Sequence, residues 1–389
     1  MHTKNNKVKK RETFYLGGYD PRGARHYYNL YKKEAISQAK VNGMQMEISA
    51  KVRTEENIQS WQINSITNNE NTQTNYHYLE WDDIVRKRWT KDFISLFFDL
   101  IFYLKTYIFS GRFMKYAKVS PYQMFFLFSP MVFLLFSIVI AGVVGYTIFY
   151  FFNGIFTLLL AIAISIYIMY WLFILGDKLG LFWLLRIFVF SGRYALEDID
   201  GLEKRLEILS SQIARYINNA KSNDVDEILL VSHSVGTILI IPLLEKTLKK
   251  LTKPIDTTLS VLVLGECIPL VSGVNIAKDY KEKMSFLAKQ HNIFWVDYTT
   301  VIDGACFPNL NYFTDAKIII EKKENFHFLS PRFHTLFSKE KYTKLRKNKY
   351  LSHFMYLKST EYEGAFDFFK MTAGHQYLCD ILSFNYCKK

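Results

Sequence analysis

Two adjacent uncharged segments constrain the fold of this chain more than any other feature of its 389 residues. Residues 124–152 and 155–175 contain no Asp, Glu, Lys or Arg, and only Asn153 and Gly154 separate them. At about 1.5 Å per helical residue, each segment is long enough to cross a hydrocarbon core of about 30 Å. The sequence therefore predicts a membrane-spanning helical hairpin. The alternative is a pair of buried core helices, but soluble cores seldom contain two such runs in succession.

Basic residues flank the hairpin on both sides, whereas its connecting turn carries none. By the positive-inside rule, both ends of the hairpin, and the rest of the chain with them, are expected in the cytoplasm. The flanking residues before the hairpin are Lys105, Arg112, Lys115 and Lys118, and those after it are Lys178, Arg186 and Arg193.

The chain carries a formal net charge of +13. An anionic membrane surface attracts basic flanks by about 1 kcal/mol per Lys or Arg, so a lipid bilayer is the expected partner. No nucleic-acid motif is evident, and we expect no nucleic-acid partner. The first ten residues are basic without an apolar core, unlike a signal peptide. The four cysteines show no metal-ligand spacing, so we expect free thiols, no metal and no cofactor. They are Cys267, Cys306, Cys379 and Cys387.

Outside the hairpin, strand and helix patterns alternate along the chain. This alternation predicts an α/β fold with a doubly wound, mostly parallel sheet that the hairpin interrupts. The expected organisation is a basic tail (1–12), a first part of the sheet domain (13–92), a membrane region (93–194) and a second part of the sheet domain (195–389). The expected strands are residues 13–16, 44–52, 60–66, 75–81, 260–264 and 293–298. The expected helices are residues 24–42, 82–89, 195–219, 238–248, 279–290 and 338–351. Residues 66–74 are expected to form a surface loop.

Segments 93–109 and 179–190 flank the hairpin and mix aromatic and aliphatic residues with single charges. They are too polar to span a bilayer. One interpretation is that they are amphipathic helices in the membrane interface. The other is that they are soluble helices packed on the sheet domain.

A serine-centred motif follows a short apolar strand pattern. Residues 227–237 read Glu-Ile-Leu-Leu-Val-Ser-His-Ser-Val-Gly-Thr, and a helical pattern begins at Ile238. Strand, small-x-Ser-x-Gly turn and helix, in that order, are typical of a turn that presents a nucleophilic serine above a sheet. Ser234 is the expected nucleophile, and the Val235 N–H would face an oxyanion. Ser232 stands where the motif usually has glycine, and an ordinary serine-capped turn is the alternative.

A serine nucleophile needs a histidine base and a carboxylate that orients the base. Asp303, in the loop after strand 293–298, suits the acid better than Asp297, which lies within that strand. Among the later histidines we favour His353 as the base and keep His334 as the alternate. The remaining histidines considered are His327, His375 and His233, the last of which is expected to point away from the nucleophile.

The second oxyanion donor is expected in the loop after the first strand. Gly17 and Gly18 occupy that place, and glycines let backbone N–H groups approach an oxyanion closely. The assignment depends on the serine motif, because glycine pairs are common in turns.

Several of these segments also carry a family resemblance. They are residues 17–23 (Gly-Gly-Tyr-Asp-Pro-Arg-Gly), 79–86 (Leu-Glu-Trp-Asp-Asp-Ile-Val-Arg), 232–236 (Ser-His-Ser-Val-Gly) and 353–357 (His-Phe-Met-Tyr-Leu). Together with the hairpin, they resemble a family of bacterial membrane-embedded α/β-hydrolase-like proteins. Residues 303–308 (Asp-Gly-Ala-Cys-Phe-Pro) are similar to the acid region of lipase-type hydrolases. The resemblance implies Ser234 as nucleophile, Asp303 as acid and His353 as base, and it implies no substrate.

The expected function is therefore a serine hydrolase in a bacterial inner membrane, with its catalytic domain facing the cytoplasm. The expected substrate is an acyl ester, and the predicted membrane anchor favours one that is delivered from the bilayer. Two alternatives remain open. One is a non-catalytic membrane scaffold with a hydrolase-like domain, and the other is a thioesterase or acyltransferase with the same residues.

Overall fold

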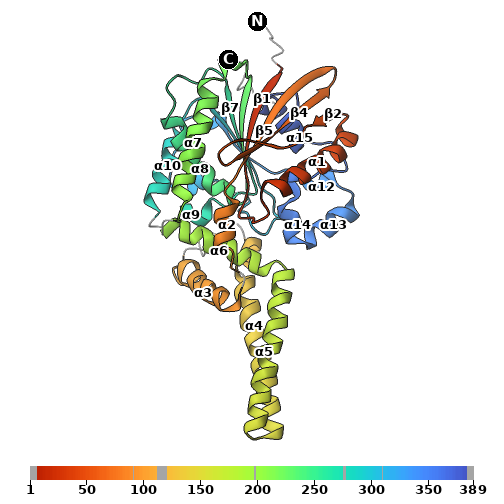
Figure 1. The fold of residues 1–389 in the computed structure, drawn as a ribbon, viewed down its shortest axis with the longest axis vertical. Coiled ribbons are helices and arrows are strands. Elements are labelled where there is room, and N and C mark those ends of the chain that lie inside the picture. Colours follow the sequence, from red (N-terminus) through yellow and green to blue (C-terminus); the bar gives the residue numbers. More distant parts are fainter. Residues whose placement is uncertain are drawn as a thin grey trace. The chain divides into compact units, whose positions relative to one another are not determined.

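The computed structural model describes residues 7–90, 92–111, 121–196, 199–274, 277–308 and 310–382 (Figure 1). The chain divides into two compact units, which are described separately below. Residues 1–89 and 193–389 form the sheet unit, and residues 90–192 form the helical unit.

The sheet unit is a mixed α/β structure around a nine-stranded, mostly parallel sheet, as the alternation of patterns predicts (Figure 1). The strand order is β2-β4-β5-β1-β6-β7-β8-β9, and β3 pairs with β4. Six neighbouring strands are parallel: β5 (Glu70–Leu79), β1 (Lys10–Leu16), β6 (Glu227–His233), β7 (Thr258–Leu264), β8 (Ile293–Tyr298) and β9 (Phe326–Leu329). The antiparallel strands at one edge are β2 (Gln45–Ile48), β3 (Val52–Glu55) and β4 (Ile58–Thr67).

This antiparallel edge differs from the sequence prediction. The expected strand 44–52 is two strands, β2 and β3. The expected loop 66–74 is wrong, because β4 and β5 run on to a tight turn at Asn68 and Asn69, with φ of 53° and 64°. Asparagine tolerates this left-handed backbone, which the two-residue turns of β-hairpins require. The polar composition misled the prediction because polar side chains occupy both faces of the two strands there, with Ser65, Thr72 and Thr74 buried.

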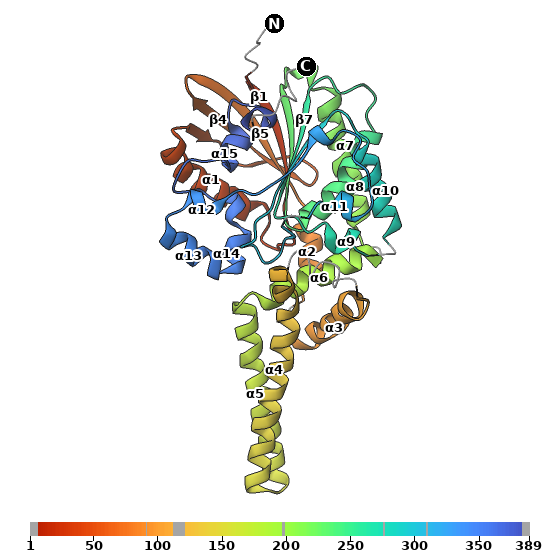
Figure 2. The ribbon, with the colours of Figure 1, turned by 180° about the vertical axis from the view of Figure 1, so that it is seen from behind.

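Helices cover both faces of the sheet (Figures 1 and 2). Helix α1 (Gly23–Asn42) lies on one face together with α15 (Phe368–Ala373), whereas α7 (Leu202–Asn218), α8 (Gly236–Lys249) and α10 (Lys278–Ala288) lie on the other. Every residue of β6 is buried, as expected for a central strand covered on both faces. The shorter helices of this unit are α2 (Asp82–Arg88), α9 (Pro269–Ser272), α11 (Tyr312–Asp315), α12 (Phe333–Leu336), α13 (Lys339–Lys347), α14 (Lys349–His353) and α16 (Leu378–Ile381).

Two helices predicted as continuous are broken. The expected helix 338–351 is α13 followed by α14, because the Asn348 side chain accepts the Leu351 N–H and starts a new helix. The expected helix 195–219 contains the end of α6 (Leu181–Leu196) and the whole of α7, which begins after the left-handed Gly201.

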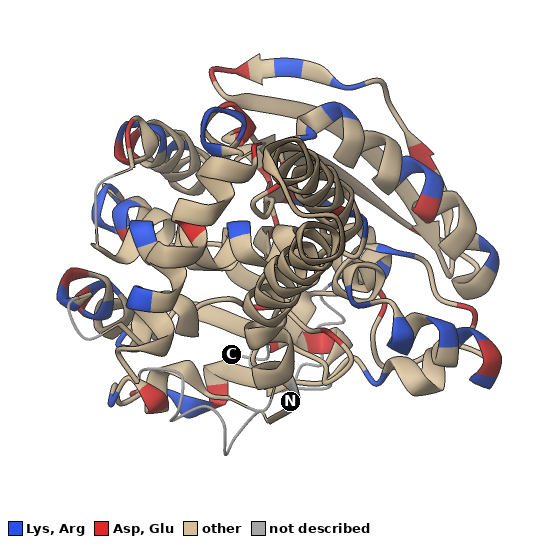
Figure 3. Ribbon diagram, turned by 90° about the horizontal axis from the view of Figure 1, so that it is seen from below, with Lys and Arg blue, Asp and Glu red and all other residues tan. Residues whose placement is uncertain are grey.

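The helical unit contains two helices that are long and apolar enough to cross a membrane. They are α4 (Pro121–Phe152) and α5 (Ile155–Lys178), each with a mean hydropathy of 2.5 in its most apolar stretch. Buried core helices would be mostly covered, but only 28% and 6% of these stretches are buried. Figure 3 shows neither blue nor red over most of both helices. Such an exposed, uncharged hairpin is suited to a hydrocarbon environment rather than to water.

Close packing holds the hairpin together. Gly145 on α4 lies against Ser165 on α5, where an added Cβ would collide with the serine hydroxyl. The Ser165 hydroxyl donates to the carbonyl of Ala141, 2.9 Å away. Small residues that let two backbones approach, joined by a hydroxyl bond, are typical of helix pairs in membranes. The rest of the unit is α3 (Phe93–Tyr103), a short π-helix (Leu104–Ile108) and most of α6.

The cysteines differ in part from the prediction. Cys267 and Cys306 are free and buried, as expected. Cys379 is disulfide-bonded, so the prediction of a free thiol is wrong there. Cys387 lies outside the described residues.

Candidate active site

The strand order places the candidate residues at one edge of the sheet. After β1 the chain continues into strands on the β5 side of the sheet, whereas after β6 it continues into β7 on the other side. The direction in which the chain adds strands to the sheet therefore reverses between the neighbouring strands β1 and β6. In open α/β sheets, ligands bind at the carboxyl ends of the strands, at such a reversal. Gly17 and Gly18 follow β1, and Ser234 follows β6. The glycine loop and the candidate nucleophile therefore meet at the position that topology favours.

Ser234 adopts a backbone conformation that few side-chain-bearing residues adopt. Its φ is +58°, in the left-handed region, between the end of β6 and the start of α8. Its N–H donates to the Leu264 carbonyl at 3.0 Å, and its carbonyl accepts from the Thr237 N–H and hydroxyl at 2.9 and 2.6 Å. A strained residue held by three hydrogen bonds at a strand-to-helix turn is typical of a serine nucleophile.

Two small neighbours make the sharp turn possible. A Cβ on Gly236 would collide with the carbonyl oxygen of Leu16, so the start of α8 packs directly on the backbone of β1. Ser232, in the place of the usual first glycine, is fully buried, and Ser234 still adopts its left-handed backbone. Its substitution is therefore compatible with the elbow conformation.

The glycine loop touches the candidate nucleophile. A Cβ on Gly18 would lie 2.7 Å from the Cβ of Ser234, a distance that real Cβ atoms essentially never show. Only glycine fits this contact. Within the described ranges, the N–H groups of Gly18 and Val235 donate to no acceptor. Val235 also begins α8, where the helix dipole favours negative charge. Gly17 contributes differently, because its carbonyl accepts the Trp81 indole N–H at 3.0 Å and anchors the loop.

Asp303 and His353 come together although fifty residues separate them in sequence. His353 Nδ1 lies 2.9 Å from both carboxylate oxygens of Asp303, and both side chains are fully buried. Asp303 also accepts the Ala305 N–H at 2.9 Å and the Tyr356 hydroxyl at 3.2 Å. Burial by itself would raise the pKa of Asp303, but His353, the Ala305 N–H and Cys306 lower it below its usual value. An ionised Asp303 requires the proton of His353 to sit on Nδ1, which leaves Nε2 as the basic nitrogen.

His233 links the nucleophile strand to the candidate base. Its Nε2–H donates to the His353 carbonyl at 2.9 Å, and the two rings lie 4.8 Å apart at 39°. Burial lowers the pKa of His233 to about 3, with His353 adding to the effect, so its ring is neutral. His233 therefore positions His353 rather than acting as a base. Sequence reasoning dismissed His233 and missed this role, since nothing in the motif shows what its ring contacts.

Gly265 lies next to the turn at Ser234 and next to the Asp303–His353 pair. It follows Leu264, which binds the Ser234 N–H, and its φ is +57°. A Cβ there would lie 3.1 Å from Asp303 Oδ2 and 3.5 Å from His353 Cε1. The end of β7 thus contacts the nucleophile turn on one side and the Asp303–His353 pair on the other.

The alternate residues lie elsewhere. His334, on α12, is exposed and contacts the ring of Tyr342. Asp297 lies inside β8, opposite Val263, and is 2% exposed. Burial raises the pKa of Asp297 well above its usual value, and the nearby Tyr312 only partly opposes this. Burial, and then Asp297, likewise raise the pKa of Glu266. This carboxyl pair holds protons, whereas Asp303 is held ionised.

Replacing Asp297 by asparagine is expected to flatten the pH dependence of stability. A carboxyl whose folded-state pKa is raised contributes stability below its unfolded pKa, and this is lost as pH rises through the folded pKa. At alkaline pH, Asp297→Asn should be more stable than wild type by about 1–3 kcal/mol, the usual cost of an unsatisfied buried polar group. Thermal unfolding across pH measures this. The exposed Asp256→Asn is the control, and equal pH slopes for all three proteins would contradict the expectation.

A second serine–histidine–carboxylate chain was not predicted. His77 Nδ1 lies 2.7 Å from the Ser60 hydroxyl, and His77 Nε2 lies 2.7 Å from Glu12. All three side chains are at least 95% buried. They sit in the middle of paired strands, where backbone N–H groups are engaged in the sheet and none is available to an oxyanion. We interpret this chain as a buried polar network that ties β4, β5 and β1 together.

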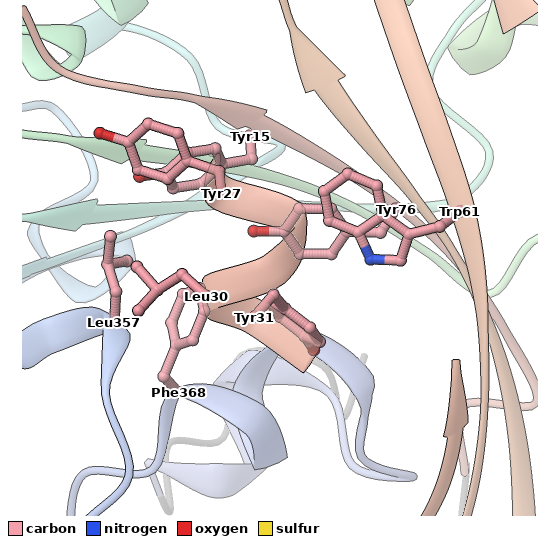
Figure 4. A pocket seen from close by; sticks show the side chains of 8 residues that line it. All are labelled: Tyr15, Tyr27, Leu30, Tyr31, Trp61, Tyr76, Leu357 and Phe368. Carbon is pink, nitrogen blue, oxygen red and sulfur yellow. The ribbon is translucent and has the colours of Figure 1, made fainter. Parts of the chain in front are cut away.

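Two cavities of the sheet unit are lined by residues other than Ser234, Asp303 and His353. One, enclosed by aromatic side chains beside the glycine loop, has a volume of about 10 Å³ (Figure 4), room for a single water molecule at most. Its walls are Tyr15, Tyr27, Leu30, Tyr31, Trp61, Tyr76, Leu357 and Phe368. The other, about 330 Å³, lies beside the starts of α7 and α10. In the described part of the chain, no cluster of three His, Cys, Asp or Glu could hold a metal ion.

Comparisons with protein families, with curated protein sequences and with solved structures found no match to this chain. The interpretation of the site therefore rests on its geometry.

Proposed function

We propose that this protein is a membrane-anchored serine hydrolase with an α/β-hydrolase-like sheet domain, which cleaves an acyl ester. Two observations carry the proposal: the buried pair of Asp303 and His353, and the strained strand-to-helix turn at Ser234. His233, the residue before Ser234, connects them through its hydrogen bond to the His353 carbonyl. A neutral imidazole whose Nδ1–H binds a carboxylate is the base that a serine hydroxyl needs.

In the proposed reaction, His353 Nε2 takes the hydroxyl proton of Ser234 while Oγ bonds to the ester carbonyl carbon. The N–H groups of Gly18 and Val235 donate to the oxyanion. His353 then gives its proton to the leaving alcohol as the ester C–O bond breaks. A water molecule, deprotonated by His353, releases the acyl group as a carboxylic acid, and the proton returns to Ser234.

The hairpin supports an ester of a bilayer lipid as the substrate, because the chain carries its own membrane anchor. The basic flanks support an inner membrane of a bacterium, with the sheet unit in the cytoplasm. The disulfide at Cys379 is the observation against this orientation, since disulfides are rare in reducing compartments. A reporter fused after Lys389 tests it, and a signal from outside the cytoplasm would contradict it.

A fluorophosphonate probe tests the proposed chemistry. The full chain, in detergent and in lipid vesicles, should react, and peptide mass spectrometry should locate the adduct on Ser234. Ser60 and Ser232 are internal comparisons, because both are buried serines outside the proposed nucleophile position. An adduct on another serine would contradict the assignment.

The non-catalytic scaffold remains the rival function, and the burial of the site favours it. Ser234 is 4% exposed and His353 is fully buried, so substrate would need a covering segment to move. Absence of any adduct in both detergent and vesicles would favour the scaffold.

A further inference from the structure

Helix α3 carries a stripe of exposed apolar side chains. Ile94, Phe97, Phe98 and Ile101 are spaced i, i+3, i+4 and i+7, so they share one face of the helix. They are 69%, 39%, 62% and 45% exposed. The opposite face is buried and consists of Leu96, Asp99, Leu100 and Tyr103. Such a stripe in water would be an aggregation or binding surface.

The position of α3 relative to the charged end of the hairpin indicates what covers this stripe. The ring of Phe93, at the start of α3, contacts the ring of Phe173 on α5, with centroids 6.2 Å apart. Phe173 precedes Lys178, the charged end of α5, by five residues, or about 7.5 Å along the helix axis. Interfacial helices bury their apolar face about 5–10 Å into the boundary between headgroups and acyl chains. The start of α3 is therefore at the depth of that boundary.

Aromatic residues on α5 mark the same level. Tyr170 and Trp171 are 58% and 51% exposed, and they precede Phe173 by only three and two residues, or about 4.5 and 3 Å along the helix axis. Exposed tyrosine and tryptophan are enriched where a membrane helix meets the headgroups. Lys105, the exposed basic residue just after α3, continues the direction of the stripe and can extend its ammonium group toward phosphates.

The other segment next to the hairpin does not share this property. Helix α6 is buried from Leu184 to Gly192, so its apolar residues are already covered by protein. The interfacial interpretation is therefore left for α3.

We propose that α3 lies in the plane of the membrane, with its stripe inserted among the lipids of the leaflet that contains the Lys178 end of α5. The occupant of the stripe is the lipid bilayer, because α3 and the two spanning helices belong to one compact unit. This proposal is independent of the hydrolase chemistry, so either can fail without the other.

Site-directed spin labelling of the full chain tests the proposal. Phe98→Cys and Ile101→Cys would each be labelled with a nitroxide and reconstituted into vesicles of phosphatidylcholine with a minor share of phosphatidylglycerol. Collision rates with oxygen, which concentrates in the bilayer, and with a water-soluble nickel chelate then report depth. Ile36→Cys is the matched control, since Ile36 is a large apolar residue 53% exposed on the charged helix α1. The unmutated protein reports any labelling of native cysteines.

Both α3 labels should show an oxygen-to-nickel collision ratio several-fold above that of Ile36→Cys, with a depth just below the phosphates. A ratio equal to the control would place the stripe in water and overturn the proposal. Low collision rates with both reagents would mean that protein covers the stripe, such as a second copy of the chain, and would also overturn it. Because the labelled positions are exposed, the substitutions remove little packing.

Discussion

Ser234→Ala should lower kcat/KM toward a lipid or aryl ester by roughly 10⁶-fold, because knocking out the nucleophile of a serine–histidine–aspartate triad removes nearly all triad-dependent catalysis. The residual rate would come from the oxyanion donors and substrate binding. Hydrolysis by the purified protein in detergent, with a chromogenic ester, measures the loss. The fold should be kept, since a methyl group still fits a residue whose backbone is held by Leu264 and Thr237.

Ser60→Ala is the matched control for this experiment. Ser60 is also a buried serine bound to a histidine that is bound to a carboxylate, but it lies within β4 rather than at a turn. Its replacement should leave kcat/KM near the wild-type value and lower the unfolding temperature. If the two variants lost activity equally, the turn at Ser234 would not be the catalytic feature.

Asp303→Asn should lower kcat by about 10⁴-fold while leaving the arrangement of side chains almost unchanged. The amide can present an N–H to His353 Nδ1, which favours the tautomer with its proton on Nε2. That tautomer cannot accept the Ser234 proton, so the base is lost although its position is kept. Steady-state kinetics should show a change in kcat larger than any change in KM.

Asp297→Asn separates the proposed catalytic carboxylate, Asp303, from its buried neighbour. Both aspartates are buried, but only Asp303 contacts a histidine among the interactions described above. Asp297→Asn should retain activity near neutral pH. If it lost activity as severely as Asp303→Asn, the acid would have to be reassigned to the Glu266–Asp297 pair.

The regular elements were largely predictable because their signals are local. Strand 293–298 matches β8 at both ends, and helix 24–42 matches α1 within one residue. The failures are at Asn68–Asn69 and at Asn348, where asparagine side chains or left-handed backbone decide whether a chain turns or continues. The polar faces of β4 and β5 also lack the apolar alternation that indicates a strand.

The candidate site was predictable only in part. Ser234, Val235 and the glycine loop follow from a compact motif and from the first expected strand. The sequence favoured Asp303 and His353 but left Asp297 and His334 open. Coordinates were needed to show that Asp303 and His353 meet, because these residues are remote in sequence. His233 and Gly265 were not predicted as part of the site, since their roles depend on rings and loops from other elements.

The sequence by itself determined the apolar helical hairpin, the α/β class and the serine turn. Each depends on a local signal: a long uncharged run, a helix or strand period, or small residues around a turn. Only the tertiary structure decided which carboxylate meets which imidazole, that Ser60 and His77 form a network inside the sheet, and that α3 exposes an apolar stripe while α6 does not. Burial and charge partners come from long-range packing, and packing also decides whether a buried carboxyl holds its proton or loses it.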